Sequence, residues 1–266
     1  MIRPLRALAL GALLSLAGCA GLPDPDGWER VHSAVHYRRW SPHEGSVVHA
    51  VRVDLRHRDI AIALTPQHEA GRTIDRFGGH AASLAAINAW FFGKAFEPRG
   101  ATRSDGSDWS NQTTPEAFPL LACGERDCAI LTDPAAFADA RWRLLVAGIP
   151  ALLRAGAPAW EPLCAPRRAF CDNPHPRTAI GLDAARQTLW IVAAEGRHEG
   201  AAGLSVAQTA MLLRELGATD AINLDGGGST TLSTCGRQRM RRPDNERELR
   251  VIGNALLVRE RGLAAQ

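Results

Sequence analysis

Apolar residues recur at alternate positions in several short segments, and this two-residue period predicts a chain rich in β-strands. Val47 to Leu55 keeps its apolar residues on one side, which predicts a half-buried strand. Ile60 to Leu64 repeats the pattern after a polar turn, so we expect these two segments to form a hairpin. Further strands are predicted at 85–88, 140–149, 178–182, 188–194, 221–224 and 250–258. The strands at 178–182 and 188–194 are expected to be joined by a turn at 183–186.

Two segments have a helical pattern instead. Ser205 and Gln208 have the spacing of a capping box, an apolar stripe follows, and Gly217 is a typical helix end. Thr73 to Ala86 predicts a second helical region, interrupted by two glycines. Strands dominate the first half of the chain, and a strand–helix–strand unit lies near 203–224. The expected fold class is therefore α+β, with a mixed β-sheet and packed helices in a single domain.

The N-terminus predicts export. Two arginines precede an uncharged apolar run that is too short to span a bilayer, and Leu16-Ala17-Gly18-Cys19 follows. This segment resembles the lipobox of bacterial lipoproteins, in which the cysteine is acylated. An ordinary signal peptide that contains a cysteine is the alternative. The predicted division is a lipoprotein signal peptide at 1–18, a tether at 19–30 and the folded domain at 31–266.

The resemblance implies a membrane partner through lipid on Cys19, in a bacterial cell envelope. Ala20 after the cysteine favours the periplasmic face of the outer membrane, by analogy with known sorting. The formal net charge of +3 is too small to indicate nucleic acid as a partner.

Five cysteines remain for the domain. Cys123 with Cys128 and Cys164 with Cys171 bracket short loops, so both pairs are predicted disulfides in an oxidising compartment. Cys235 is then expected as a buried thiol. Zinc is the rival interpretation, but neither pair has the two-residue spacing of a zinc knuckle. We predict no metal site and no cofactor.

The sharpest local feature is the segment from Asn223 to Thr231, in which Asp225 and three glycines follow an apolar strand. Glycines permit positive φ and a close approach of ligand to backbone. Successive amides in such a turn can form a nest that binds an anion. The glycine spacing matches neither a Walker phosphate loop nor a dinucleotide fingerprint. A plain turn is the alternative.

A wider ordered set of motifs gives this loop a context. The set comprises Ile87-Asn88-Ala89-Trp90-Phe91-Phe92, Pro176-Arg177-Thr178-Ala179-Ile180-Gly181, Glu195-Gly196-Arg197, the Asp225 loop and Gly253-Asn254-Ala255-Leu256. In this order it resembles the phosphodiester glycosidase family, over about 47–258. One departure is Ala89-Trp90, where the family usually has two glycines after the asparagine. Trp90 is expected either to stack on a sugar or to fill part of the pocket.

The resemblance implies a sugar-1-phosphodiester substrate that is cleaved between the anomeric carbon and the phosphate oxygen. Asp225 is the first catalytic candidate, as nucleophile or through a bound water, because a carboxylate stabilises the cation-like sugar. Glu195 is the second, as acid/base or sugar ligand. Arg177 is the expected phosphate clamp, since its planar fork can bind two phosphate oxygens.

The remaining candidates bind substrate. Arg197 is expected as a second anion contact, and Asn88 and Asn223 suit sugar hydroxyls. The loop amides from Gly226 to Ser229, Gly227 included, are expected to share the phosphate charge. Structural interpretations compete with these roles: Arg177 can pair with Asp225, Glu195 can cap a turn at Gly196, and Asn223 and Asn254 can tie loop backbone together.

The leading hypothesis is a hydrolase that cleaves sugar-1-phosphodiesters in envelope or exopolysaccharide material. The alternative, motivated by Ala89-Trp90, is a non-catalytic envelope lipoprotein that binds phosphorylated glycans or cell-wall polymer. A metal-dependent phosphodiesterase, with Asp225 and Asp105 holding a hard cation, is a third and weaker option.

Overall fold

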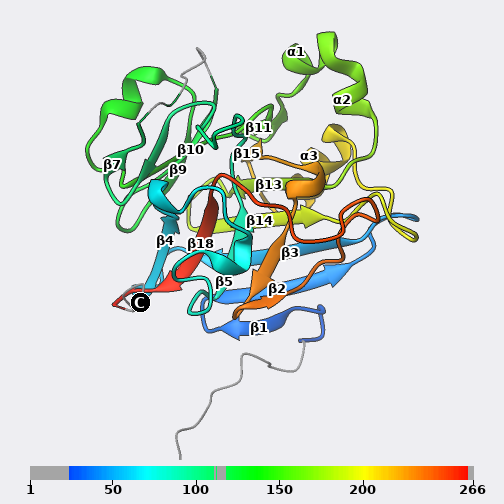
Figure 1. The fold of residues 1–266 in the computed structure, drawn as a ribbon, viewed down its shortest axis with the longest axis horizontal. Coiled ribbons are helices and arrows are strands. Elements are labelled where there is room, and N and C mark those ends of the chain that lie inside the picture. Colours follow the sequence, from blue (N-terminus) through cyan, green and yellow to red (C-terminus); the bar gives the residue numbers. More distant parts are fainter. Residues whose placement is uncertain (1–23, 111, 113–117, 263–266) are drawn as a thin grey trace, which may run out of the picture.

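Strands dominate the architecture, which the computed structural model describes for residues 24–110, 112 and 118–262 (Figure 1). The largest sheet has eight strands, and every ladder in it is antiparallel. Its spatial order is β1 (Glu29–His32), β2 (Val35–Trp40), β3 (Val48–Asp54), β14 (Thr188–Ala194), β13 (Arg177–Leu182), β15 (Asp220–Asn223), β11 (Ala151–Arg154) and β12 (Ala157–Pro158).

Two five-stranded sheets complete the β structure, and their ladders are also antiparallel. One has the order β7 (Ser107–Asp108), β6 (Thr102–Ser104), β10 (Leu144–Ala147), β8 (Leu120–Cys123) and β9 (Cys128–Leu131). The other has the order β17 (Arg237–Gln238), β16 (Leu232–Thr234), β5 (Ala85–Asn88), β18 (Ala255–Glu260) and β4 (Ile60–Leu64).

The α-helices are short and lie at one end of the molecule (Figure 1). They are α1 (Glu161–Cys164), α2 (Arg168–Asp172) and α3 (Val206–Glu215). In α3 the Ser205 hydroxyl accepts from the Gln208 amide, and the Gln208 side chain accepts from the Ser205 amide, so the predicted capping box is confirmed. None of the helices in the described part of the chain has the length and apolar character needed to cross a bilayer.

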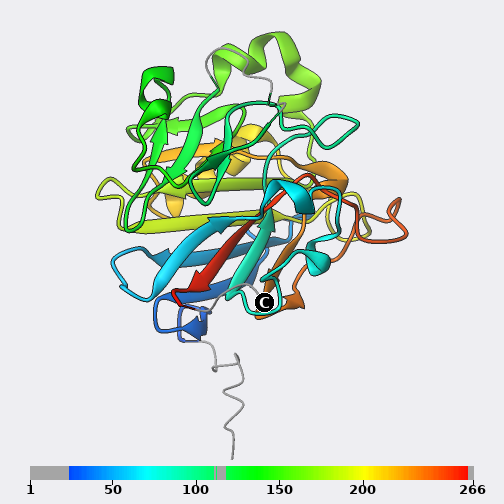
Figure 2. The same cartoon turned by 60° about the vertical axis from the view of Figure 1, so that its left-hand side comes forward.

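The eight-stranded sheet is covered on both faces. Val51 and Val53 of β3 belong to a core shared with the two smaller sheets, whereas Val48 and Ala50 belong to a core that includes α3. The layers are therefore helix, large sheet and small sheets (Figure 2). The strand predicted at 47–55 was expected to be half-buried. It is in fact buried on both faces, because a hydrophobic core packs against each face of β3.

The α+β class and the single domain hold, although the helices are sparse. Three finer predictions are wrong. The sheets are antiparallel rather than mixed; β3 and β4 lie in different sheets rather than in one hairpin; and 73–86 holds only a short 3₁₀ turn at Ile74–Arg76 before β5. Pairing across sheets depends on residues far away in sequence, which a local pattern does not contain.

The hairpin of β13 and β14 is confirmed over six residue pairs, from Arg177 with Ala194 to Leu182 with Leu189. The predicted strand–helix–strand unit is also present: β14, α3 and β15 follow one another, and β15 returns to the other side of β13. This arrangement brings the ends of β13, β14 and β15 into one region, where the candidate site lies.

Both predicted disulfides are present, Cys123–Cys128 across β8 and β9 and Cys164–Cys171 between α1 and α2. Cys235 is also disulfide-bonded and is only partly buried, so the prediction of a leftover buried thiol is wrong. The predicted signal peptide and Cys19 lie outside the described residues, as does the first part of the tether.

Candidate active site

The aspartate loop connects two of the sheets. It begins where β15 ends and continues into a 3₁₀ turn at Gly227–Ser229. The Asp225 amide donates to the Ala89 carbonyl at 2.9 Å, and the Asn88 side-chain amide donates to the Asp225 carbonyl at 2.6 Å. Because Asn88 ends β5, these bonds fix the backbone of Asp225 against the third sheet.

The Asp225 carboxyl is held by its own loop. Burial raises its pKa from 3.8 to about 6, although hydrogen bonds from the Ser229 hydroxyl and the Gly226 amide and the charge of Arg250 act in the opposite direction. A carboxyl with a pKa near 6 exchanges protons close to neutral pH, which is the property that general acid/base catalysis requires. Ser229 is therefore a support for Asp225 rather than part of an amide nest.

Asp225 lines a cleft of about 260 Å³ that carries three arginines, one histidine and two phenylalanines. The loop supplies one wall and the segment around α2 another. The lining residues are Phe91, Phe170, His175, Pro176, Arg177, Arg197, Asn223, Asp225, Gly226, Gly227, Gly228 and Arg250. A single carboxyl surrounded by guanidinium groups suits a ligand with a phosphate beside a group that becomes positive.

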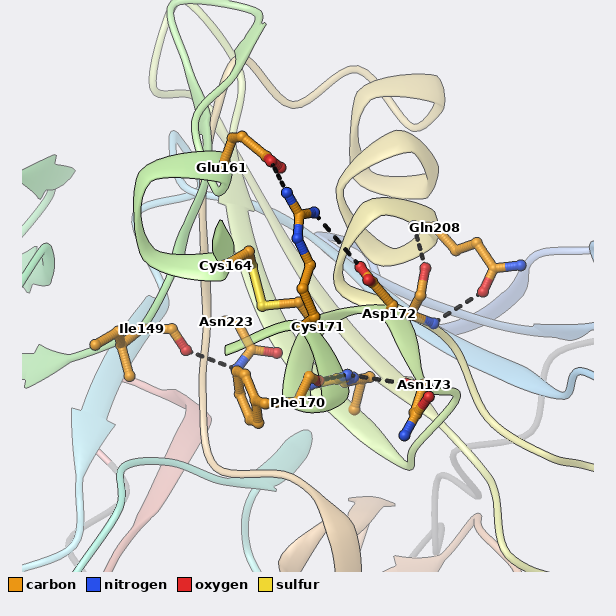
Figure 3. Close-up of a disulfide and its surroundings, with 12 residues drawn as sticks. Ile149, Glu161, Cys164, Phe170, Cys171, Asp172, Asn173, Gln208 and Asn223 are labelled. Atoms are coloured by element: carbon orange, nitrogen blue, oxygen red, sulfur yellow. Dashed lines mark hydrogen bonds and ion pairs between the residues drawn. A yellow bond between two sulfur atoms is a disulfide. The ribbon is translucent and has the colours of Figure 1, made fainter. Parts of the chain in front are cut away.

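Arg177 lines this cleft, as the sequence predicted, but its guanidinium group donates hydrogen bonds to backbone carbonyls. It is 2 % exposed, and its Nε donates to the Leu204 carbonyl at 3.0 Å. Its Nη2 donates to the carbonyls of Phe170 at 2.6 Å and Asn173 at 3.3 Å (Figure 3). Burial, with a smaller effect of Arg197, lowers its pKa to about 10. It does not pair with Asp225, so Arg177 supplies buried positive charge rather than a free two-pronged clamp.

Arg197, unlike the buried Arg177, is exposed. Its backbone has the left-handed φ of 58°, which is uncommon for a residue with a side chain and is typical of functional sites. Its Nη2 lies 3.2 Å from Nδ1 of His175. A Cβ added to Gly227 would lie 3.3 Å from Arg197 Nη1, so the guanidinium packs directly on the glycine loop.

Gly226 permits a close backbone approach. A Cβ at this position would lie 2.7 Å from the Pro176 carbonyl oxygen, so only glycine allows the loop to pack against the start of β13. Two of the loop amides expected to face the phosphate are, however, already engaged within the protein. The Gly227 amide donates to the Pro176 carbonyl at 2.9 Å, and the Ser229 amide donates to the Gly226 carbonyl at 3.2 Å. These amides stabilise the turn instead of facing a ligand.

The two predicted sugar-binding asparagines hold the framework. Asn88 Oδ1 accepts from the Thr178 hydroxyl at 2.8 Å and from the Thr231 amide at 3.1 Å, and Asn88 is absent from the cleft lining. Asn223 lines the cleft, but its Nδ2 donates to the carbonyls of Ile149 and Leu224, each at 2.8 Å (Figure 3). The buried Oδ1 of Asn223 has no hydrogen-bond partner in the described part of the chain.

Glu195 is not brought into the Asp225 cleft. It lines a separate cleft of about 500 Å³ and is 3 % exposed. Its oxygens accept from His49 Nε2 at 2.8 Å, His198 Nε2 at 2.9 Å and the Arg241 amide at 2.8 Å. Burial raises the pKa of Glu195, but these hydrogen bonds outweigh it and hold the pKa below 4.5. The geometry favours a structural role over the predicted acid/base role.

Trp90 neither stacks on a ligand nor fills the cleft. It is 2 % exposed, donates its indole N–H to the Arg99 carbonyl, and packs edge-on against Phe91 and Phe118 with ring centroids 4.7 and 5.6 Å away. The tryptophan is therefore a core residue behind Phe91, and only Phe91 reaches the cleft. The Ala89-Trp90 departure from the family pattern therefore places a large side chain in the core and not in the cleft.

No group of three or more potential metal ligands occurs among the described residues. Asp105, considered with Asp225 for a hard cation, forms an ion pair with Arg143 and lines a different cleft. Asp105 and Asp225 therefore do not form the pair on which the hypothesis of a metal-dependent phosphodiesterase was based.

Five lining residues were missed by the sequence analysis: Phe91, Phe170, His175, Pro176 and Arg250. Phe91 and Pro176 lie within motifs that the sequence analysis quoted, and His175 directly precedes one of them. Their positions in the sequence could therefore have identified them. Phe170 and Arg250 had no local signal. Phe170 comes from the disulfide-linked α2, and Arg250, which pairs with Glu246, comes from the irregular segment before β18.

Comparison with known proteins agrees with this geometry. Residues 81–259 match the model of a family described as phosphodiester glycosidase. No curated protein matches significantly. Among solved structures, the catalytic domain of zebrafish N-acetylglucosamine-1-phosphodiester alpha-N-acetylglucosaminidase, auto-inhibited by its pro-peptide, is 21% identical with a TM-score of 0.72, over 86% of each chain.

Two further structures share the fold. A hypothetical protein from Synechocystis is 17% identical with a TM-score of 0.61, over 85% of this chain and 62% of the other. A Burkholderia pseudomallei protein described as exported is 17% identical with a TM-score of 0.61, over 80% of this chain and 74% of the other. At these identities the structures establish a common fold.

Proposed function

Since this chain belongs to the phosphodiester glycosidase family, we propose that it hydrolyses sugar-1-phosphodiesters, between the anomeric carbon and the phosphate oxygen. One observation carries the proposal: the Asp225 carboxyl lies in a single cleft with the guanidinium groups of Arg177, Arg197 and Arg250. The carboxyl suits the cationic sugar of the transition state, and the arginines suit the phosphate that leaves.

In the proposed reaction, a water oxygen bonds to the anomeric carbon as the bond to the phosphate oxygen breaks. Ionised Asp225 accepts the proton of the water, and the phosphate leaves as a monoester that needs little protonation. Arg197 and Arg250 lie at the cleft surface and balance its added negative charge, while buried Arg177 adds positive potential from behind. Phe91 and Phe170 offer apolar surface to a sugar ring or to the aglycone.

The test uses three probes: the methyl phosphodiester of α-glucose-1-phosphate, the p-nitrophenyl glucoside and bis-p-nitrophenyl phosphate. We expect turnover of the first only. In ¹⁸O-water the label should enter the sugar, because the C–O bond breaks. Label in the phosphate would indicate a phosphodiesterase instead and would overturn the proposal. Addition of EDTA in a parallel sample tests the prediction that no metal is required.

The pH profile should follow Asp225. As a base it acts only when ionised, and its pKa is about 6. We therefore expect kcat/KM for the phosphodiester to fall about tenfold for each pH unit below 6 and to level off above it. The measurement is initial rates from pH 4 to 9. A profile that instead declines above pH 6 would show that Asp225 acts as an acid.

The substrate is proposed to be envelope or exopolysaccharide material, with the protein exported and anchored through lipid on Cys19. The two disulfides within the domain support an oxidising compartment. Intact mass of the protein from its native membrane tests the anchor. Added acyl chains on Cys19 would support it, and a Cys19–Cys235 disulfide in a peptide map would exclude it, because one sulfur cannot carry both.

A non-catalytic glycan-binding role is not proposed. Its motivation was the Ala89-Trp90 departure, and Trp90 is a core residue that is 2 % exposed. Binding of the phosphodiester without any turnover would nevertheless be the result that favours it.

A further inference from the structure

The segment from Cys164 to His175 contributes Phe170 and His175 to the cleft lining, so it forms a wall of the cleft. Contacts within the protein fix this wall. Its disulfide sulfurs are buried, with Cys164 at 0% and Cys171 at 2% exposure. Arg168 forms ion pairs with Glu161 of α1 and with Asp172. A wall fixed in this way can hold other groups in place.

The His175 ring contacts both Arg197 and the backbone of its own segment. Its Nδ1 lies 3.2 Å from Nη2 of Arg197. A guanidinium only donates hydrogen bonds, so Nδ1 must accept and the ring proton must be on Nε2. The ring also forms a hydrogen bond with the Ala169 backbone, which the protonated nitrogen can donate to the carbonyl. His175 therefore lies between its own segment and the Arg197 guanidinium.

The partner of the Arg197 guanidinium is thus a neutral ring rather than a carboxylate. The positive charge is held in position without being cancelled. Arg197 is otherwise an exposed, long side chain on the Gly227 face of the cleft. Such a side chain loses rotamer freedom when it binds a ligand, and a partner that orients it beforehand reduces this loss.

We propose that His175 is a positioning residue that connects the disulfide-linked wall to Arg197 and holds this guanidinium ready for the substrate phosphate. The proposal rests on the proposed function for the identity of the ligand. The contact itself needs only an anion in the cleft.

The test measures binding of inorganic phosphate to the intact domain by calorimetry. His175→Leu removes the acceptor and should weaken binding about tenfold, whereas His175→Asn, whose Oδ1 takes the place of Nδ1, should stay within about threefold. Arg197→Gln should weaken binding at least as much as His175→Leu. The double variant should be no weaker than Arg197→Gln alone, because His175 acts through Arg197.

Exposed His43, outside the cleft, gives the matched control His43→Leu, which should bind phosphate as the unsubstituted protein does. Unchanged binding in His175→Leu, or losses that add in the double variant, would overturn the proposal. If thermal unfolding shows that His175→Leu does not fold, His175→Gln replaces it. The glutamine amide group extends toward the Nε2 position and leaves no acceptor at the Nδ1 position that faces Arg197. Phosphate binding requires no turnover. A protein that binds phosphate in this way but hydrolyses none of the probes would contradict the proposed function and would still support the role of His175.

Discussion

Replacing Asp225 with asparagine should lower kcat for the sugar-1-phosphodiester by about 10³-fold, with little change in KM. Asparagine has the same shape as aspartate and can still accept from the Ser229 hydroxyl and the Gly226 amide. It cannot accept the proton of the attacking water or balance a cationic sugar. Initial rates at pH 8, where Asp225 is ionised, give the comparison.

The fold of this variant should survive. The folded pKa of Asp225, about 6, is raised above 3.8, so its ionisation costs stability progressively as the pH rises from about 4 to about 6. Asparagine removes that cost, and the variant should be at least as stable as the unsubstituted protein at pH 8. Asp220→Asn, at the start of the same strand and outside the cleft, is the matched control and should keep its activity. Full activity in Asp225→Asn would remove this residue from the mechanism.

Replacing Glu195 with alanine should lower the free energy of unfolding by about 3 kcal/mol at pH 7. The carboxylate is 3 % exposed and accepts from two histidines and the Arg241 amide. The two ring nitrogens of His198 face the Glu199 carbonyl and the Glu195 carboxylate, so this ring also has Glu195 as a partner. Removing Glu195 leaves these donors buried without an acceptor. Urea unfolding measures the loss.

The effect should depend on pH. The folded pKa of Glu195 is lowered from 4.5, so its stabilising contribution is complete above 4.5 and disappears as the pH falls through the folded pKa. The penalty of the substitution should therefore shrink in acid. Exposed Glu199 in the same loop gives the control Glu199→Ala, expected within about 0.5 kcal/mol of the unsubstituted protein. If Glu195→Gln instead lost activity at unchanged stability, Glu195 would be catalytic after all.

These two substitutions distinguish the roles of Asp225 and Glu195, which the sequence analysis both named as catalytic candidates. Asp225 and Glu195 both follow buried strands of the same sheet and both are followed by glycine. Their surroundings differ: one is flanked by arginines in an open cleft, and the other is enclosed by hydrogen-bond donors. Environment, rather than residue type, assigns their roles.

Several features followed from the sequence because they are local. The capping box of α3, the β13–β14 hairpin, the short-loop disulfides and the loop at Asp225 all involve residues a few positions apart. Hydrogen bonding and chain geometry over such spacings leave few alternatives, so the residue pattern suffices. The ordered motifs added the family.

Tertiary structure alone decided the rest. Strand partners such as β3 with β14 are far apart in the chain, and so are the cleft residues Phe170, Arg197 and Arg250. Whether Arg177 faces a ligand or three carbonyls, and whether Trp90 is a sugar platform or core, depends on which distant side chains pack around each. The sequence determined which groups this protein has for its chemistry. The fold determined which of them are buried and which meet, because burial and long-range contact are properties of the packed chain and not of any segment.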